Sequence, residues 1–363
     1  LKGHFMAKYL STEFIEWLNQ HAAEIDQSNQ YADELFKRVA QEGIFKIGVP
    51  EALGGKGGSF QQAIESVREI STYSLTAGFI SWGHRTLIQN LLSSKNSLPR
   101  ERWLDGLLNG ELSGGTGLSN AVKFLSGIEE LQVTIVEEGG KRYLQGRLPW
   151  ITNLKESGFI TIFAAEYADS SKPPVIIVLP YNANGVTRTK ELSLVALQGS
   201  NTVAIELNHV ELDPDWIIAE NAGEYLAQVR PTFLGLQCAM AFGLAARSLA
   251  EVKKSLDYVD NRSVLKPEYD EQVQKLANLE HRLAEGLNQS NFFIDNPKAL
   301  FDVRIEIVGV VASSLLLELQ ASGGRGYLQN AGSDFIRRWR EGAFLPVVTP
   351  SVLQLKTILQ AAK

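Results

Sequence analysis

The spacing of apolar residues divides the chain into three parts with different periodicities. From residue 11 to 110, apolar residues recur at three- and four-residue intervals, which predicts amphipathic helices. These helices are expected over 11–43, 61–94 and 100–108. The stretch 47–58, IGVPEALGGKGG, contains too many glycines to remain helical and is predicted to be a loop.

After Gly110 the pattern changes to the two-residue alternation of strands. Residues 131–136, LQVTIV, alternate in this way, and the EEGG that follows is typical of a hairpin turn. Further strands are expected over 143–146, 159–165, 175–179, 187–191 and 202–207.

From residue 220 onward the chain returns to long helices, expected over 225–260, 267–288 and 300–321, and around FIRRWREGAF. The order is helical, then β, then helical, without the βαβ alternation of a doubly wound nucleotide-binding sheet. We therefore predict an α+β fold with domains at 1–110, 111–220 and 221–363. This is a helical domain, a β domain and a helical bundle domain.

Charge and composition exclude several classes of protein. A net charge of -6 and the absence of a basic tract argue against nucleic-acid binding. No run of 18 apolar residues occurs, so no membrane span is expected. Residues 1–10 lack the apolar core of a signal peptide, which favours a cytoplasmic protein. The single cysteine, Cys238, lies in an apolar run and is expected to be a buried structural thiol, and no metal site is predicted.

A glycine motif stands between two expected helices near the C-terminus: Gln320-x-x-Gly323-Gly324-x-Gly326-Tyr327. Without a Cβ, these glycines let the backbone approach a ligand closely. A break between helices also directs free N–H groups outward, which suits a phosphate or diphosphate. The alternative is a tight helix–helix turn with no ligand.

A second motif lies in the β part, where a strand with Tyr143 and Gly146 continues into Trp150-Ile151-Thr152. Residues two apart on a strand share a face, so Trp150 and Thr152 are expected to point the same way. An indole can cover a flat heterocycle, and a threonine hydroxyl can bond one of its ring atoms. The alternative is a tryptophan that fills a gap at the barrel edge.

Together these motifs resemble the acyl-CoA dehydrogenase family, which has the phrase Q-x-x-GG-x-GY followed by an Arg-acid pair, here Arg340-Glu341. The VPE…GG-x-G loop and the Trp-x-Thr phrase are similar to those of the family as well. The resemblance covers roughly residues 10–360. It implies an N-terminal helical domain, a central β-barrel and a C-terminal four-helix bundle. It also implies an FAD-dependent oxidoreductase acting on the CH–CH group of an acyl-CoA-like substrate.

The resemblance assigns cofactor contacts residue by residue. Trp150 and Thr152 would line the flavin ring, with Thr116 and, as a guess, Ser119 on the partner loop. Four residues of the C-terminal domain would contact the flavin nucleotide across a subunit interface: Arg262, Gln320, Gly323 and Gly324. This sharing implies a homodimer or homotetramer. Leu265 and Asp270 depart from the family's Phe and Gln, which weakens the contact expected around Arg262.

Two residues would lie near the substrate. Arg230 is expected to open the first C-terminal helix beside the substrate pocket, and the alternative is a solvated arginine at a helix start. His84 lies within an apolar helical stretch. It would either contact substrate or serve packing alone.

The family's catalytic glutamate is missing. Counted from Arg340-Glu341, Thr349 occupies its position, and residues 345–355 contain no Asp or Glu. Val229 stands at the second place where family members carry a base. Glu341, about 12 Å away along a helix, cannot stand in. The catalytic base is therefore unknown.

Three functions remain open. The first is a flavin dehydrogenase with an unrecognised base and an electron-transfer flavoprotein as partner. The second is a flavin monooxygenase of the same fold, which uses O2 and reduced FAD or FMN from a flavin reductase. The third is a non-catalytic flavin-binding homologue. The substrate, the redox partner and the number of subunits do not follow from the sequence.

Overall fold

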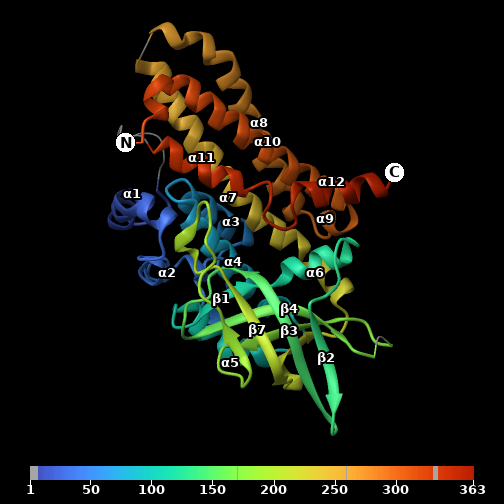
Figure 1. Cartoon of the computed structure of the whole chain (residues 1–363). Helices are drawn as coiled ribbons and strands as arrows, with labels where there is room; N and C mark the ends of the chain where they lie inside the picture. Colours follow the sequence, from blue (N-terminus) through green and yellow to red (C-terminus); the bar gives the residue numbers. More distant parts are fainter. Residues whose placement is uncertain (1–6, 170, 259, 330–333) are drawn as a thin grey trace.

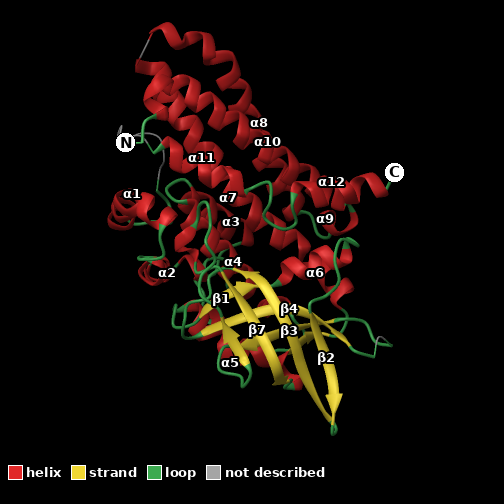
Figure 2. Ribbon diagram, viewed as in Figure 1, coloured by secondary structure: helices red, strands yellow, loops and turns green. Residues whose placement is uncertain are grey.

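The computed structural model describes residues 7–169, 171–258, 260–329 and 334–363, so six of the ten N-terminal residues considered for a signal peptide lie outside the described residues. Helices occupy both ends of the chain and a sheet occupies its middle, as Figure 1 shows. In Figure 2 most of the helices gather on one side of the molecule and the strands on the other, with α5 and α6 beside the strands. The predicted α+β fold is confirmed, whereas the predicted domain boundaries remain a prediction.

The N-terminal helices are α1 Thr12–Gln27, α2 Ala32–Gln41, α3 Phe60–Ser71, α4 Leu75–Ser93 and α5 Leu98–Leu108. The single helices expected over 11–43 and 61–94 are each two helices, because polar residues interrupt them. The Ser74 side chain accepts a hydrogen bond from the Ala77 N–H and starts α4 anew. Ser59 and Gln62 form a capping box that starts α3.

The glycine-rich loop 47–58 is held by the buried side chain of Arg85 from α4. Its Nε donates to the Ile47 carbonyl at 3.2 Å and its Nη2 to the Gly48 carbonyl at 3.4 Å. Short 3-10 turns at Ile44–Lys46 and Glu51–Leu53 complete the loop. The expectation of a non-helical loop is confirmed, apart from these turns.

The strands are β1 Ser113–Thr116, β2 Val133–Glu138, β3 Lys141–Ile151, β4 Phe159–Tyr167, β5 Val175–Pro180, β6 Val186–Arg188, β7 Val203–Glu211 and β8 Ile217–Ala219. They form one sheet in the order β6-β7-β3-β2-β4-β5-β8, with β1 pairing β4. Gly139 and Gly140 have φ of 58° and 79°, which makes the predicted hairpin turn between β2 and β3. Sequence analysis missed β1, β8 and the helix α6 Leu118–Leu125, which replaces an expected loop.

Strands β4 and β5 connect the two halves of the protein because both of their faces are buried. In β4, Phe159 and Phe163 belong to the core formed by the strands, while Ile160 and Ile162 pack with the helices. The side chains of β5 alternate in the same way. This explains the continuous apolar runs of these two strands.

The C-terminal helices are α7 Ala222–Tyr258, α8 Lys266–Asn288, α9 Phe292–Asp295, α10 Pro297–Ser322, α11 Phe335–Phe344 and α12 Val352–Ala361. Helix α7 is long and apolar enough to cross a membrane, but 94% of its most apolar window is buried inside the protein. It packs against α3, α4 and α10, so the core accounts for its composition. The 3-10 turns Asp260–Leu265 and Gly323–Tyr327 lie at one end of this bundle.

Candidate functional site

A hydrogen bond between two hydroxyls joins the β part to the C-terminal part. Ser119 of α6 donates from its Oγ to the Oγ1 of Thr349, at 3.1 Å. Thr349 lies between α11 and α12, and in Figure 1 α6 is the element of the β part that faces the C-terminal helices. The residue guessed to be on the flavin loop and the residue at the expected catalytic position therefore lie together.

Two buried polar side chains of the C-terminal helices hold the segment that contains Thr349. Gln237 of α7 donates from Nε2 to the Thr349 carbonyl at 2.9 Å. Its Oε1 accepts from Nε of Arg304 in α10, at 2.6 Å. Arg304 also donates from Nη2 to the carbonyls of Leu345 and Val348, at 2.8 and 3.3 Å. Two helices of the C-terminal bundle, α7 and α10, thus fix the position of Thr349.

Arg304 carries a positive charge into the core. Its side chain is 1% exposed, and within the described ranges its partners are all neutral oxygens. Its Nη1 is buried without a hydrogen-bond partner. Burial lowers the pKa of this guanidinium.

The two residues predicted to line a flavin ring differ in environment. Trp150 of β3 is 54% exposed, so it is not a gap-filling barrel residue. Thr152 follows the end of β3 and is buried, with its hydroxyl donating to the Ser200 carbonyl and accepting from Thr202. The register shift between Leu148 and Ile151 disturbs the alternation from which a shared face was inferred. The predicted flavin roles of both residues remain predictions.

Thr116 is the last residue of β1 and is buried directly before α6. Two residues of chain separate it from Ser119. Its predicted flavin contact stays a prediction, since its position next to Ser119 is compatible with it.

Arg230 lies inside α7, eight residues after the first residue of that helix, rather than at its start. The expectation of a helix-opening arginine is wrong because Ala222–Val229 already form two turns. The guanidinium lies 5.0 Å from the centre of the Phe301 ring, and its Nε is buried without a partner. Burial lowers its pKa. An unpartnered donor of this kind is compatible with the predicted substrate contact.

The residues predicted to bind the flavin nucleotide lie at the far end of the bundle. Gln320 and Arg304 are both in α10, 16 residues and therefore about 24 Å apart along the helix axis. Gly323 and Gly324 are exposed, with open space where a Cβ would stand. The N–H of Gly323 caps α10 and is therefore not free, contrary to expectation. Arg262 is in the 3-10 turn at the same end, so these four residues can join the site around Thr349 only from another copy.

His84 is a packing residue, and the predicted substrate contact is contradicted. It is 0% exposed, its Nε2 donates to the Leu107 carbonyl at 2.7 Å, and its Nδ1 accepts from the Gly114 N–H at 2.9 Å. The Phe45 ring lies 3.9 Å away, centre to centre. Burial lowers the pKa of His84 to about 3, so the neutral imidazole joins α4 to α5 and β1.

Glu341 is buried and serves the core. Its carboxylate accepts from the Leu75 N–H at the start of α4 and pairs with Arg337 at 2.6 Å. Burial raises its pKa. Helix α11 ends at Phe344, so the helical distance to Thr349 assumed from sequence does not apply. The conclusion that Glu341 cannot replace the missing base still holds.

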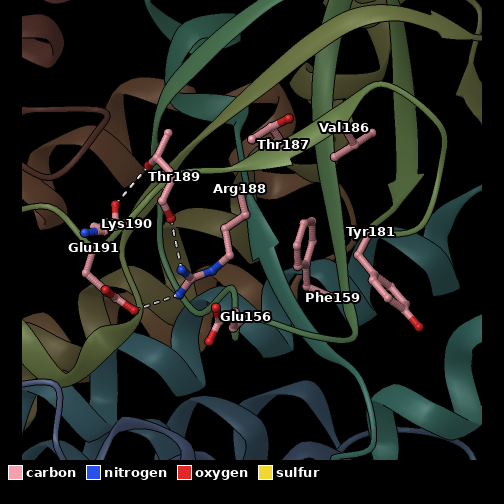
Figure 3. A pocket seen from close by; sticks show the side chains of 9 residues that line it. All are labelled: Glu156, Phe159, Tyr181, Val186, Thr187, Arg188, Thr189, Lys190 and Glu191. Atoms are coloured by element: carbon pink, nitrogen blue, oxygen red, sulfur yellow. Dashed lines mark hydrogen bonds and ion pairs between the residues drawn. The ribbon is translucent and has the colours of Figure 1, made fainter.

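A separate pocket of about 540 Å³ lies at the edge of the barrel (Figure 3). Phe159 and Tyr181 form one side, and Arg188 on the opposite side pairs with Glu191 at 3.0 Å. None of the predicted site residues lines this pocket.

Among the described residues, the side chains bonded to the Thr349 segment are a hydroxyl, an amide and a buried guanidinium, and none of them is a carboxylate. Sequence reasoning missed Gln237 and Arg304. The signal available was a polar residue in each of two otherwise apolar helical runs, FLGLQCAMAF and LFDVRIEIVGVV.

Residues 8–111 match the family model described as acyl-CoA dehydrogenase, N-terminal domain. Isovaleryl-CoA dehydrogenase of Pongo abelii is 25% identical over 228 residues, which are 61% of this chain and 53% of the relative. The aligned part thus spans about half the length of that relative. A 3-(aryl)acrylate reductase of Clostridium sporogenes is 22% identical over 344 residues, 90% of each protein.

Two solved structures share the fold over nearly the whole chain. Butyryl-CoA dehydrogenase from Megasphaera elsdenii superposes with a TM-score of 0.79 at 17% identity, covering 98% of this chain and 100% of the other. FkbI, which serves biosynthesis of a methoxymalonyl extender unit, superposes with a TM-score of 0.81 at 12% identity, covering 96% and 98%. At these identities the likeness concerns the fold alone.

Proposed function

Because the chain belongs to the acyl-CoA dehydrogenase family, we propose that it is a flavin-dependent oxidoreductase whose flavin ring lies between Trp150 and the segment around Thr349. The observation that carries this proposal is the bond between Ser119 and Thr349. One residue comes from the proposed flavin loop and the other from the position of the family's base. Their contact supports a single reaction site at this place.

The side chains proposed for the site are of kinds that fit a flavin. The indole of Trp150 is 54% exposed and offers a flat apolar surface to a ring system. Arg230 keeps a buried donor without a partner. A bound flavin would supply hydride or electron transfer, while Trp150 would orient it and the hydroxyls of Ser119 and Thr349 would meet the substrate. FAD is the flavin proposed, with Arg262, Gln320, Gly323 and Gly324 reaching it from another copy in a dimer or tetramer.

The substrate proposed is an acyl-CoA or a related acid, changed at the bond between its α- and β-carbons. Two relatives are named for acyl-CoA substrates and one for an arylacrylate, which is a free acid. An electron-transfer flavoprotein is the proposed redox partner of a dehydrogenase reaction.

A second candidate function is a flavin monooxygenase. It is favoured by Thr349 at the position of the family's base and by the absence of Asp and Glu from residues 345–355. Such an enzyme takes no α-proton from its substrate, so it needs no carboxylate there. The flavin would be reduced FAD or FMN delivered by a flavin reductase, and O2 would be the second substrate.

Spectroscopy of the purified full-length chain tests both candidates. The dehydrogenase predicts a bound yellow flavin that bleaches without oxygen when acyl-CoAs are added. The monooxygenase predicts tighter binding of reduced than of oxidised flavin, with product formation that depends on O2. A chain that binds neither form of FAD or FMN contradicts the proposed function. A chain that binds flavin but turns over no substrate leaves the non-catalytic binding protein.

A further inference from the structure

Arg304 differs from the buried arginines around it in the charge of its partners. Arg247, Arg337 and Arg338 each pair with a carboxylate, at Glu251, Glu341 and Glu318. Among the described residues, Arg304 bonds only an amide oxygen and two carbonyls. Buried charges in proteins are normally paired, so an unpaired one beside a reaction site indicates that an anion is supplied by a ligand.

Arg85 is also buried without a carboxylate partner, but its setting differs. Its Nη1 donates to Gln89 at 3.0 Å, and its other donors meet the carbonyls of the loop 47–58. Arg304, by contrast, has an unpartnered Nη1 and lies two hydrogen bonds from Thr349. Only the second arginine is therefore connected to the site, and Arg85 is a matched control for it.

The directions of the hydrogen bonds make Thr349 a donor. Ser119 donates to its Oγ1, and Gln237 donates to its carbonyl oxygen. The hydroxyl proton of Thr349 is then left for an acceptor outside this chain of bonds, since a hydroxyl that accepts one bond can still donate another. A buried cation behind it strengthens the attraction for a negatively charged acceptor.

Resting on the flavin-dependent function above, we propose that Thr349 is an oxyanion-binding residue and that Arg304 is its positioning residue. The ligand is a substrate whose carboxyl or thioester carbonyl oxygen carries full or developing negative charge. Where other family members place a carboxylate that accepts a proton, this chain places a donor that holds an oxygen. Preorganised donors of this kind are the usual means of stabilising such charge.

The test compares a charged ligand with its neutral isostere. The flavin-loaded protein is titrated with 3-phenylacrylate and with 3-phenylacrylamide, and binding is followed by calorimetry. We expect the acid to bind at least about tenfold more tightly, the size of one hydrogen bond to a charged group. Thr349→Val and Arg304→Gln should each remove most of this preference, while Arg85→Gln should keep it. Titration with 3-phenylacryloyl-CoA identifies the ligand oxygen. Tighter binding of the CoA thioester indicates a thioester carbonyl, and tighter binding of the acid indicates a free carboxylate.

The proposal is overturned if acid and amide bind equally, if acid, amide and CoA thioester all fail to bind at millimolar concentration, or if folded Thr349→Val keeps the full affinity of the parent for the ligand that binds. Valine has nearly the shape of threonine but no hydroxyl. If Arg304→Gln is too unstable to fold, Thr349→Val therefore still reports the effect of losing the hydrogen-bond donor. The acid preference is also measured without flavin. Failure to bind flavin therefore counts against the proposed function, and failure to prefer the anion counts against this inference.

Discussion

The hydroxyl of Ser119 donates to the hydroxyl of Thr349 at 3.1 Å, although 230 positions separate the two residues. This bond is the direct side-chain link between α6 and the segment that precedes α12. It brings together two residues that were recognised in separate motifs. Because the Thr349 hydroxyl accepts this bond, its own proton is left to donate to a ligand.

Removing this bond should loosen the segment around Thr349. We expect Ser119→Ala to lower the free energy of unfolding by about 0.5–1.5 kcal/mol, the value of one intramolecular hydrogen bond, as measured by urea denaturation. Ser126→Ala is the control, because the Ser126 hydroxyl bonds only within its own helical turn, to the Val122 carbonyl. Equal losses in the two variants would contradict a special role for Ser119.

Replacing Trp150 should affect cofactor binding without affecting the fold. The side chain is 54% exposed, so Trp150→Ala should leave the melting temperature nearly unchanged. It should weaken flavin binding by about tenfold or more, the loss of one aromatic stacking contact on a desolvated ring. Fluorescence titration with FAD gives the affinity. Trp339→Ala, at 43% exposure on α11, is the control and should bind flavin like the parent. Unchanged affinity in Trp150→Ala would rule out the proposed ring contact.

His84 should make the protein sensitive to acid. Burial lowers its folded-state pKa to about 3, whereas an unfolded histidine takes up its proton near pH 6.5. Between these values the unfolded state binds the extra proton, so the free energy of unfolding falls as the pH falls, by up to about 1.4 kcal/mol per pH unit. Measuring unfolding between pH 7 and 4 in the parent and in His84→Gln checks this. The variant should show a shallower slope, and parallel curves would refute the assignment.

Glu341 should matter for stability and not for chemistry. Its carboxylate pairs with Arg337, which is itself buried, and accepts from the Leu75 N–H. Glu341→Gln removes the close, buried counter-charge of the guanidinium and leaves it only the half-exposed Asp334 at 3.6 Å, so it should cost about 3 kcal/mol in unfolding free energy. Glu251→Gln is the milder control, since that carboxylate is 22% exposed. If the remaining folded Glu341→Gln protein lost only catalysis and no stability, Glu341 would have to be reconsidered as a base.

Gly324 offers a test of the site shared between copies. Nothing lies within 4 Å of a Cβ built there, so Gly324→Ala should leave the isolated chain as stable as before. If this turn approaches a flavin nucleotide of another copy, the added methyl group should weaken flavin binding or assembly, measured by titration and by sedimentation. Gly309→Ala, also in open space but inside α10, should be neutral or stabilising by about 0.5–1 kcal/mol. Identical behaviour of both variants would place Gly324 outside any nucleotide site.

The sequence predicted the elements that depend on local periodicity. The apolar stripes of α7, α8 and α10 and the alternation in β2 led to the right element types. The boundaries failed where a side chain decided them, as at Ser74, whose hydroxyl starts a new helix. Helix α6 was missed because it has only eight residues between Gly117 and Ser126, too few for a helical period to emerge.

The candidate site was predicted only in part, for a physical reason. Trp150 and Thr349 belong to recognisable phrases, so they could be named from the sequence. Gln237 and Arg304 act through partners 112 and 41 or more positions away, and no local pattern encodes such bonds. The role of His84 stayed open between substrate contact and packing, because a histidine in an apolar helix gives the same pattern whether its nitrogens meet a ligand or backbone groups.

Helix α11 imposes an order on the biogenesis of the protein. Arg340 reaches Asp26 of α1 at 3.1 Å across 314 positions, and Glu341 holds the first turn of α4. Until residues 340 and 341 have been synthesised, the buried carboxylate of Asp26 has no guanidinium to pair with, and the Leu75 N–H lacks its carboxylate acceptor. Helices α1 and α4 therefore reach their final contacts only after α11 has been made.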